Sequence, residues 1–355
     1  MSDLIFVPRE EYALLADTLD HLLPDAASLP PDWKTLWADL ATSGALAVGL
    51  PEAEGGLDDA RAVSVVAERL GQHGAVSPFI VSNAVVARAL AKAPRAAAFD
   101  ALRARLADGS AVVTLALPAD RPLAMDAAAG PYKVSGACKL VPFGAEADHV
   151  LVEGMTAGGD AVLALVPASA RRVERAVAGI DGFPYADMSF DGVVSADQVL
   201  ATGDEARQLA AWCRDTWLAT LCADAVGAMA TLVKMTGDYL KVRQQFGRRL
   251  SSYQVLQHRY VDMDMALIES RTVAEWAAGL LDAGRDDERR VAVTTAHFVV
   301  ARAATRISQE SVQLHGGIGM AQETPVGRYF KRLLTLPLLF GDEDAAAASY
   351  SGAAA

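Results

Sequence analysis

The sequence predicts an α+β protein in which a β-rich segment lies between two helical ones. Apolar residues recur at helical spacing up to about residue 109, short β-rich runs with turn residues between them follow, and long amphipathic segments occupy the rest. We therefore expect three domains: an N-terminal helical domain at 1–109, a middle β barrel or sandwich at 110–203, and a C-terminal four-helix bundle at 204–355.

The first segment carries apolar positions three and four residues apart, which is the period of one helix face. This pattern covers residues 12–23 and returns at 63–71. A Leu-Pro-Pro-Asp run at 29–32 separates the first helix from another at 33–41, because proline cannot continue a helix. We expect helices in all three places.

The middle segment changes character near residue 110. Gly, Pro and Asp punctuate short apolar runs there, as they do between the strands of small barrels and sandwiches. The expected strands are 111–117, 132–136, 149–153, 161–167 and 187–193.

The last segment reads as helices longer than those of most globular proteins, near 206–245, 253–283 and 287–314. Each is amphipathic rather than apolar all round, so each must bury one face against another helix. A four-helix bundle is the simplest packing that achieves this.

Composition excludes several classes of protein. The net charge of −12 disfavours nucleic acid as a partner. No uncharged apolar stretch reaches the ~18 residues of a membrane-spanning helix, and the N-terminus lacks the pattern of a signal peptide. Three cysteines without CxxC spacing fit neither a disulfide framework nor a zinc site, so we expect a reducing cytoplasm. An anionic ligand would need local basic clusters, and the chain has one at 243–249 and another at 328–332.

Two motifs combine a cation, an aromatic ring, an amide and bare backbone. Arg243 offers a planar fork of donors for phosphate, and Phe246 offers a face for a flat ring. Gln313 can donate to and accept from the edge of a heterocycle, and Gly316 and Gly317 allow a ligand to approach the main chain. The set suits a ligand that has both phosphates and rings. His315, beside the glycines, is expected to serve as a helix cap.

The order of these motifs resembles that of acyl-CoA dehydrogenases. Arg-x-Gln-Phe-Gly at 243–247 is followed by Tyr-Gln-x-x-Gln at 253–257, Gln-x-His-Gly-Gly-x-Gly at 313–319 and Pro-Val-x-Arg at 325–328. Fainter matches are Gly-Leu-Pro-Glu-x-x-Gly-Gly at 49–56 and Gly-x-x-Lys at 136–139. The resemblance implies a helical–β–helical fold, FAD as the cofactor and α,β-dehydrogenation of an acyl-CoA thioester.

By resemblance, five residues contact the ADP half of an FAD whose flavin ring lies in a neighbouring subunit. They are Arg243, Phe246, Gln313, Gly317 and the adjacent Gly316. The family needs two further parts in each complete chain, a pocket for the flavin ring and a carboxylate base.

The ring pocket departs from the family pattern. Its Thr-Glu-Pro and Gly-Ser-Asp motifs are replaced by Ala-Leu-Pro-Ala-Asp-Arg-Pro at 116–122, and the following segment reads Leu-Val-Pro-Phe-Gly at 140–144, where proline removes a backbone donor.

The base also departs from the pattern. The usual position, counted from Arg332, falls at Gly341, which leaves Asp342 and Glu343 as weak candidates. The other position used in the family falls at Trp217, with Asp215 nearby as a poor substitute.

These departures predict a small subunit that clamps FAD but lacks the base. Its partner would be a catalytic acyl-CoA dehydrogenase chain in an α2β2 heterotetramer, acting on a bulky acyl-CoA such as a steroid side chain or dicarboxylic thioester, with an electron-transfer flavoprotein as acceptor. The alternatives are a self-sufficient homotetramer with Asp342 or Glu343 as base, and a binding paralogue without flavin.

Overall fold

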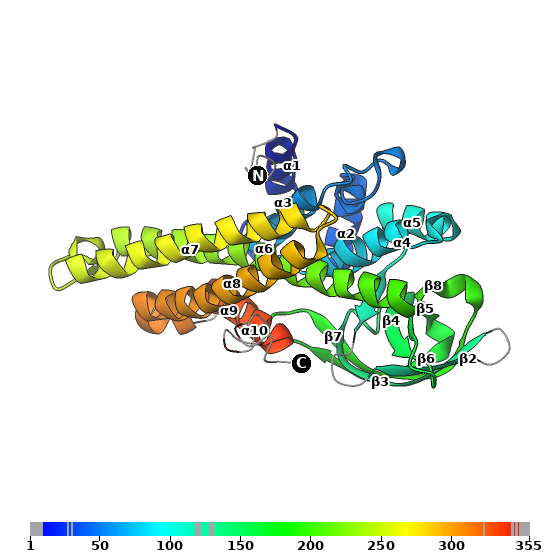
Figure 1. The fold of residues 1–355 in the computed structure, drawn as a ribbon. Coiled ribbons are helices and arrows are strands. Elements are labelled where there is room, and N and C mark those ends of the chain that lie inside the picture. The colour runs from blue at the N-terminus through cyan, green and yellow to red at the C-terminus, as the bar shows by residue number, and fades with distance from the viewer. Residues whose placement is uncertain are drawn as a thin grey trace. The chain divides into compact units, whose positions relative to one another are not determined.

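The computed structural model describes residues 10–26, 28–29, 31–117, 122–127, 131–321, 324–341, 344 and 347. Helices come first, strands occupy the middle and long helices follow, as the sequence predicts (Figure 1). The helices of the described residues are α1 Glu10–Leu22, α2 Trp33–Thr42, α3 Ala60–Gln72, α4 Arg88–Lys92, α5 Asp100–Ala107, α6 Gly203–Val242, α7 Gln254–Leu280, α8 Asp286–His315, α9 Val326–Leu333 and α10 Thr335–Phe340.

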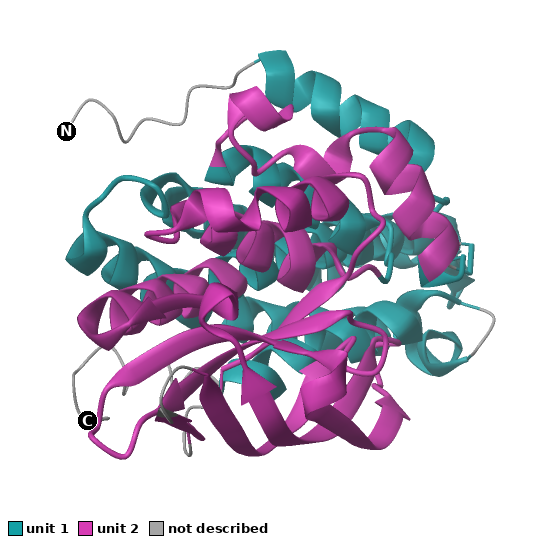
Figure 2. Ribbon diagram, turned by 90° about the vertical axis from the view of Figure 1, so that its right-hand side faces the viewer, with its two compact units in different colours: residues 1–33, 60–76, 218–355 teal, residues 34–59, 77–217 magenta. Residues whose placement is uncertain are grey.

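The chain forms two compact units, and each is built from segments that are not contiguous in sequence (Figure 2). Unit 1 contains residues 1–33, 60–76 and 218–355, and unit 2 contains residues 34–59 and 77–217. The division into domains at 1–109, 110–203 and 204–355 stays a prediction.

Unit 2 is built on one eight-stranded sheet with the order β6-β7-β3-β2-β4-β5-β8, in which β1 pairs with β4. Its strands are β1 Val113–Ala116, β2 Leu123–Ala127, β3 Tyr132–Pro142, β4 His149–Met155, β5 Ala161–Pro167, β6 Arg171–Ala178, β7 Pro184–Val194 and β8 Val199–Thr202. All five expected strands are present. The sequence reading missed β2 and β8, which are short, and β6, whose Arg-Arg-Val-Glu-Arg run is largely exposed.

Helical segments of unit 2 pack with the sheet through a fully buried π-helix, Ile80–Ala87. Asn83 within it donates to the carbonyls of Leu46 at 2.8 Å and Leu106 at 2.9 Å. These bonds tie three separate segments of the chain together.

Unit 1 holds the long helices and buries a core in which alanines pack with larger aliphatic side chains. Glycines let α3 and α6 approach closely: a Cβ at Gly71 would lie 1.9 Å from the carbonyl oxygen of Asp224, and one at Gly227 would lie 1.9 Å from that of Glu68. Asp224 also pairs with Arg332 of α9, and both side chains are buried.

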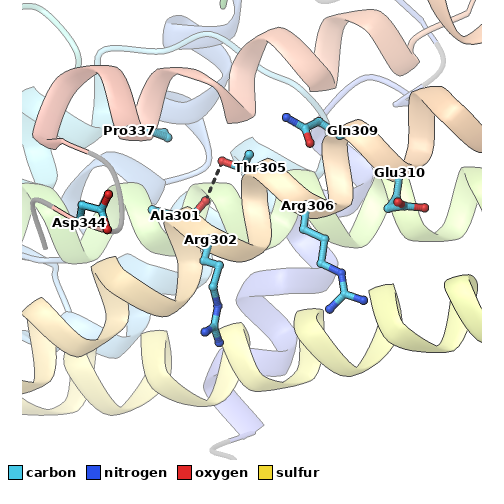
Figure 3. Close-up of a pocket in the computed structure, with 8 residues that line it drawn as sticks. All are labelled: Ala301, Arg302, Thr305, Arg306, Gln309, Glu310, Pro337 and Asp344. Atoms are coloured by element: carbon cyan, nitrogen blue, oxygen red, sulfur yellow. Dashed lines mark hydrogen bonds between the residues drawn. The ribbon is translucent and has the colours of Figure 1, made fainter. Parts of the chain in front are cut away.

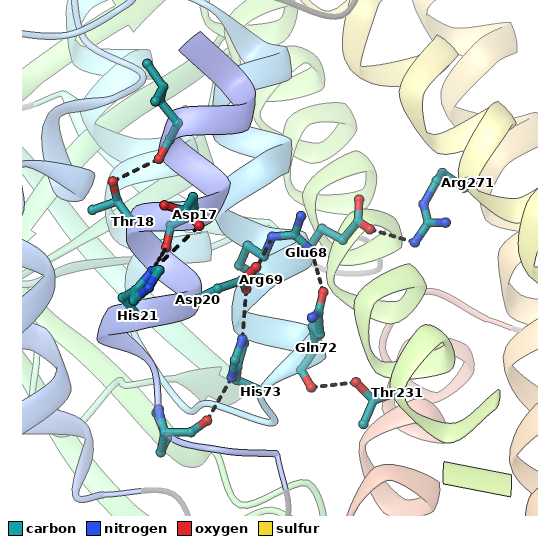
Figure 4. A network of polar contacts seen from close by, with 12 residues as sticks. Asp17, Thr18, Asp20, His21, Glu68, Arg69, Gln72, His73, Thr231 and Arg271 are labelled. Atoms are coloured by element: carbon teal, nitrogen blue, oxygen red, sulfur yellow. Dashed lines mark hydrogen bonds and ion pairs between the residues drawn. The ribbon is translucent and has the colours of Figure 1, made fainter. Parts of the chain in front are cut away.

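A polar network joins α1, α3 and α6 within unit 1 (Figure 4). The Nε2 and Nδ1 atoms of His73 lie 3.0 Å from Oδ1 of Asp20 and 2.7 Å from the carbonyl of Pro24. Thr231 donates to the carbonyl of Gln72 at 2.6 Å. The N-terminal helix is therefore fastened to the long helices.

α6 is apolar and long enough to cross a membrane by composition alone. Of its most apolar 18-residue window, 78% is buried inside the protein. Packing within the fold therefore accounts for its apolar character.

Candidate functional site

The first motif forms a small hairpin directly after α6. Its strands, β9 Gln244–Gln245 and β10 Arg248–Arg249, pair antiparallel. The N–H of Leu250 donates to the carbonyl of Arg243 at 2.9 Å, which extends the ladder by one pair toward α6. Arg243 thus sits at the base of the hairpin.

Phe246 and Gly247 form the two-residue loop of this hairpin. Both have positive φ, 51° and 78°, as a type I′ turn requires. This conformation is costly for a bulky residue such as phenylalanine. The Phe246 side chain is nevertheless 91% exposed, so no burial within the described chain compensates for the strained backbone. Strain of this kind is typical of sites that hold a ligand.

The second motif forms the C-terminus of α8. Gly316 has φ 64° and ψ −146°, close to a region that only glycine occupies readily, and its N–H donates to the carbonyls of Val312 and Gln313. A Cβ at Gly316 or Gly317 would meet no heavy atom within 4 Å. The exposed Gln313 side chain and the bare backbone beside it therefore border open space.

Tyr239 brings the two motifs together. Its ring stacks on the imidazole of His315, with centroids 4.5 Å apart, and its hydroxyl donates to the His315 carbonyl at 3.3 Å. Tyr239 lies one helical turn before Arg243, and its carbonyl accepts the Arg243 N–H at 2.9 Å. The ends of α6 and α8, far apart in sequence, are thus neighbours.

His315 is structural in this arrangement. It is buried, and its Nδ1 lies 2.8 Å from the carbonyl of Ser311 one turn earlier, which it can reach only as a donor. Burial lowers the pKa of His315, so the ring is neutral near neutral pH.

Positive charge at this site must come from side chains. Both motifs follow helix C-termini, whose free carbonyls carry partial negative charge. Arg243 is exposed and has no ion pair among the described residues. Its guanidinium is available to an anionic ligand. We name the exposed set Arg243, Phe246, Gln313, Gly316 and Gly317 the clamp.

The second basic cluster of the sequence is mostly structural. Arg328 donates to the carbonyls of Ser28 at 2.7 Å and Ala26 at 2.5 Å, and Arg332 is committed to Asp224. Lys331 remains exposed.

Backbone N–H groups of the segment 140–144 in unit 2 are hydrogen-bonded within the protein. The N–H groups of Leu140, Phe143 and Gly144 donate to Asp187 Oδ1 at 3.0 Å, to the Pro184 carbonyl at 2.8 Å and to the Val141 carbonyl at 3.1 Å. Pro142, at the end of β3, has no N–H to offer.

The Phe143 ring is buried and lies edge-on to Phe183, at 5.9 Å between centroids. The Phe143 side chain and the N–H groups of Leu140, Phe143 and Gly144 are therefore not free for a ligand.

The candidate bases receive no support from geometry. Asp342 and Glu343 lie outside the described residues. Trp217 and Asp215 are half-buried on α6.

A cavity of ≈ 380 Å³ lies along α8 and α10 (Figure 3). Arg302 and Arg306 line it, but Arg306 pairs with Asp262 at 2.8 Å and Arg302 lies 3.9 Å from Glu269. Glu310 on its wall pairs with Arg259 at 2.6 Å. The cavity is therefore balanced in charge, and it contains no residue of the clamp.

Comparison with known proteins decides the family. The acyl-CoA dehydrogenase C-terminal domain matches residues 219–349. Acyl-CoA dehydrogenase FadE28 of Mycobacterium tuberculosis is 29% identical over 351 residues, covering 95% of each chain. The chain belongs to the acyl-CoA dehydrogenase family.

Solved acyl-CoA dehydrogenases share its fold. A chain of the ChsE4-ChsE5 complex from Mycobacterium tuberculosis matches with a TM-score of 0.88 at 24% identity, covering 98% of both chains. A chain of a variant of the Tcur3481-Tcur3483 steroid ACAD matches with a TM-score of 0.84 at 25% identity, covering 97% of this chain and 98% of that one. The prediction of an acyl-CoA dehydrogenase fold is confirmed.

The acyl-CoA dehydrogenases are FAD-dependent oxidoreductases, so FAD is the cofactor. Open space around Gly316 and Gly317, the unpaired Arg243 and the outward Phe246 ring fit an ADP group that arrives from outside the chain. The segment 140–144 does not fit a flavin ring, because the N–H groups of Leu140, Phe143 and Gly144 are already bonded and Pro142 has none.

The sequence reading missed the residues that support the clamp. Tyr239 belongs to none of the quoted motifs and looks like an ordinary helix residue. Tyr253 opens the Tyr-Gln-x-x-Gln motif, but the sequence assigned it no role of its own. For Tyr239, the position one turn before Arg243 is the signal that could have found it. Tyr253 lies directly before α7.

Proposed function

We propose that this chain is the small, non-catalytic subunit of a two-chain acyl-CoA dehydrogenase. It would clamp the ADP half of an FAD whose flavin ring lies in a catalytic partner chain. The observation that carries this proposal is an asymmetry. The clamp is exposed and its Arg243 has no ion pair among the described residues, whereas three N–H groups of the segment expected at the flavin ring are bonded internally.

Similar chains come from two-chain assemblies. ChsE4-ChsE5 is a complex, and Tcur3481-Tcur3483 is a steroid ACAD with two named components. They support an α2β2 heterotetramer for this chain, with a catalytic dehydrogenase chain as its partner.

The division of labour follows from the chemistry. FAD would supply the acceptor for the β hydride of the acyl-CoA, and a carboxylate would be needed to remove the α proton. We assign the base and the ring pocket to the partner. In this chain, Arg243 would neutralise phosphate charge, and Phe246 and Gln313 would contact rings of the nucleotide. Gly316 and Gly317 would admit the ligand to the backbone.

A bulky acyl-CoA suits such an assembly. A subunit without its own flavin pocket leaves room for the substrate of the neighbouring site. The steroid ACAD among its structural neighbours favours a steroid side-chain thioester, with a dicarboxylic acyl-CoA as the other candidate. We propose an electron-transfer flavoprotein as acceptor, a cytoplasmic location, and no nucleic acid or membrane as partner.

The first experiment is native mass and flavin content. The chain is purified alone, and from its native host as a tagged copy with its partners. We expect a flavin-free chain alone, and a yellow complex with one FAD for every two chains that dehydrogenates an acyl-CoA. A homotetramer with one FAD per chain that reduces on adding acyl-CoA would overturn the proposal and favour a self-sufficient enzyme with Asp342 or Glu343 as base.

Arg243→Ala tests the clamp directly in that complex. Loss of a charge-assisted phosphate contact, about 1.5–3 kcal/mol, should release FAD on dilution. Retention of FAD would indicate a paralogue that does not contact the flavin nucleotide.

A further inference from the structure

The ladder register places Arg243 and Arg248 on one face of the hairpin. Gln245 lies opposite Arg248, and Arg243 lies opposite Leu250. Side chains that are two apart on a strand, or opposite each other across a ladder, share a face. Arg249, the next residue along β10, belongs to the other face.

Tyr253 holds Arg248 in place. The Arg248 guanidinium lies 3.9 Å from the centroid of the Tyr253 ring. The Tyr253 hydroxyl donates to the Gln245 carbonyl on the opposite strand at 3.1 Å, and its N–H donates to the Leu250 carbonyl at 3.1 Å. One residue thus braces both strands and supports the cation.

A stacked guanidinium keeps its recognition edge. Its five N–H donors lie in the plane of the group, so contact with the Tyr253 ring leaves them able to bind a phosphate. No ion pair to Arg248 lies within the described part of the chain. The Arg248 side chain is therefore held in one orientation, and its charge has no carboxylate partner among the described residues.

This arrangement is unfavourable without an anion. Two like charges on one face of a ladder repel each other. A hairpin of two residue pairs is marginal by itself, and its turn is strained at Phe246. A ligand with two adjacent phosphates would relieve the repulsion and stabilise the hairpin.

We infer that Arg248, positioned by Tyr253, is a second phosphate-binding cation of the clamp. Arg243 and Arg248 together would grip the diphosphate of FAD, and Arg249 would take no part. The inference rests on the proposed function and adds Arg248 as a binding residue and Tyr253 as a positioning residue.

The test compares Arg248→Gln with Arg249→Gln, which removes the same charge from the opposite face of the same hairpin. FAD release from the two-chain complex is followed by the fluorescence of freed flavin over a range of salt concentrations. We expect Arg248→Gln to speed release roughly tenfold and Arg249→Gln to stay within about twofold. Release from the Arg248→Gln complex should also depend less on salt, because one phosphate contact is gone.

Two substitutions of Tyr253 separate its roles. Tyr253→Phe keeps the ring beneath Arg248 and removes the bond to Gln245, so release should rise by only about twofold to threefold. Tyr253→Leu removes the platform and should approach the effect of Arg248→Gln, including its reduced salt dependence. Circular dichroism of each complex checks that α6 and α7 remain folded.

The outcomes distinguish this inference from the proposed function. Equal release from the Arg248→Gln and Arg249→Gln complexes would overturn the role of Arg248, provided that Arg243→Ala still frees FAD. If Arg243→Ala also leaves FAD bound, the proposed clamp itself fails.

Discussion

The ring of Tyr239 stacks on the imidazole of His315 at an interplanar angle of 23° and also donates a hydrogen bond to the His315 carbonyl. This one pair links the helix end before Arg243 to the helix end before Gly316. The clamp therefore depends on a contact between two residues that we do not place against the ligand.

Replacing Tyr239 should loosen the clamp. Tyr239→Leu removes the stacking and the hydrogen bond together, which should cost about 1–3 kcal/mol of unfolding free energy. FAD release from the two-chain complex should speed up as well. Tyr239→Phe keeps the ring and is the matched control. If Tyr239→Leu lowers stability but leaves FAD release unchanged, the helix ends are not coupled to cofactor binding.

Gly317 should matter for binding rather than for folding. A methyl group there meets no heavy atom within 4 Å, so Gly317→Ala should change the unfolding free energy by no more than about 0.5 kcal/mol. It would, however, occupy the space where we expect the nucleotide. We predict faster FAD release at an unchanged melting temperature, measured on the same complex.

Gly71 and Gly227 should show the reverse pattern. An added Cβ at either position meets a backbone oxygen at 1.9 Å, so α3 and α6 must move apart. Each alanine variant should lose about 2 kcal/mol or more of stability despite the better helix propensity of alanine. Denaturant unfolding measures this loss of stability. Gly159 cannot serve as the control position, because its positive φ would strain an alanine there as well.

The Asp224–Arg332 pair should be costly to break and cheap to replace. Both side chains are more than nine-tenths buried, at 7% and 5% exposure. Asp224→Asn should cost about 3–5 kcal/mol, because the buried charge of Arg332 loses the carboxylate that faces it. A double variant, Asp224→Leu with Arg332→Met, should recover most of that loss in denaturant unfolding. Equal losses in the single and double variants would show that the charge itself is not the source.

Acidification should destabilise the fold through two histidines, the buried His315 and the half-buried His149. Burial lowers the pKa of His315 and His149, so the unfolded chain takes up protons at a higher pH than the native chain does. Their contribution to stability is complete above the ordinary histidine pKa of about 6.5 and is lost as pH falls below it.

His315→Gln should flatten the stability profile between about pH 7 and 5. His21 contributes in the opposite sense, because a backbone contact and the charge of Asp17 raise its pKa. A profile that is equally steep with and without His315 would contradict this assignment.

Sequence periodicity predicted α1 to α3, the three long helices and the longer strands, but not the short helices α4, α5, α9 and α10. The lengths of α6, α7 and α8 follow from sustained amphipathic patterns, and β4 and β5 follow from continuous apolar runs. The pattern failed at β6, because an edge strand with exposed arginines shows no alternation to detect. A local pattern likewise cannot predict that segments remote in sequence assemble into unit 1.

The clamp residues could be proposed from sequence motifs, but the residues that hold them in place could not. Arg243 and Gln313 are marked by the residues around them. The stacking of Tyr239 on His315, and of Arg248 on Tyr253, depends on which helix ends meet and on a register that only coordinates reveal.

Under the proposed function, the contacts of segment 140–144 make a flavin pocket difficult to build here by single substitutions. Restoring a donor at Pro142 would leave Phe143 in the core, and withdrawing Phe143 would open a cavity beside Phe183. Freeing the Leu140 N–H would take a partner from Asp187. Each of these changes alone would lower stability before it freed a donor for a cofactor. Under the proposed function, a flavin pocket is therefore more readily supplied by the partner chain than rebuilt in this one.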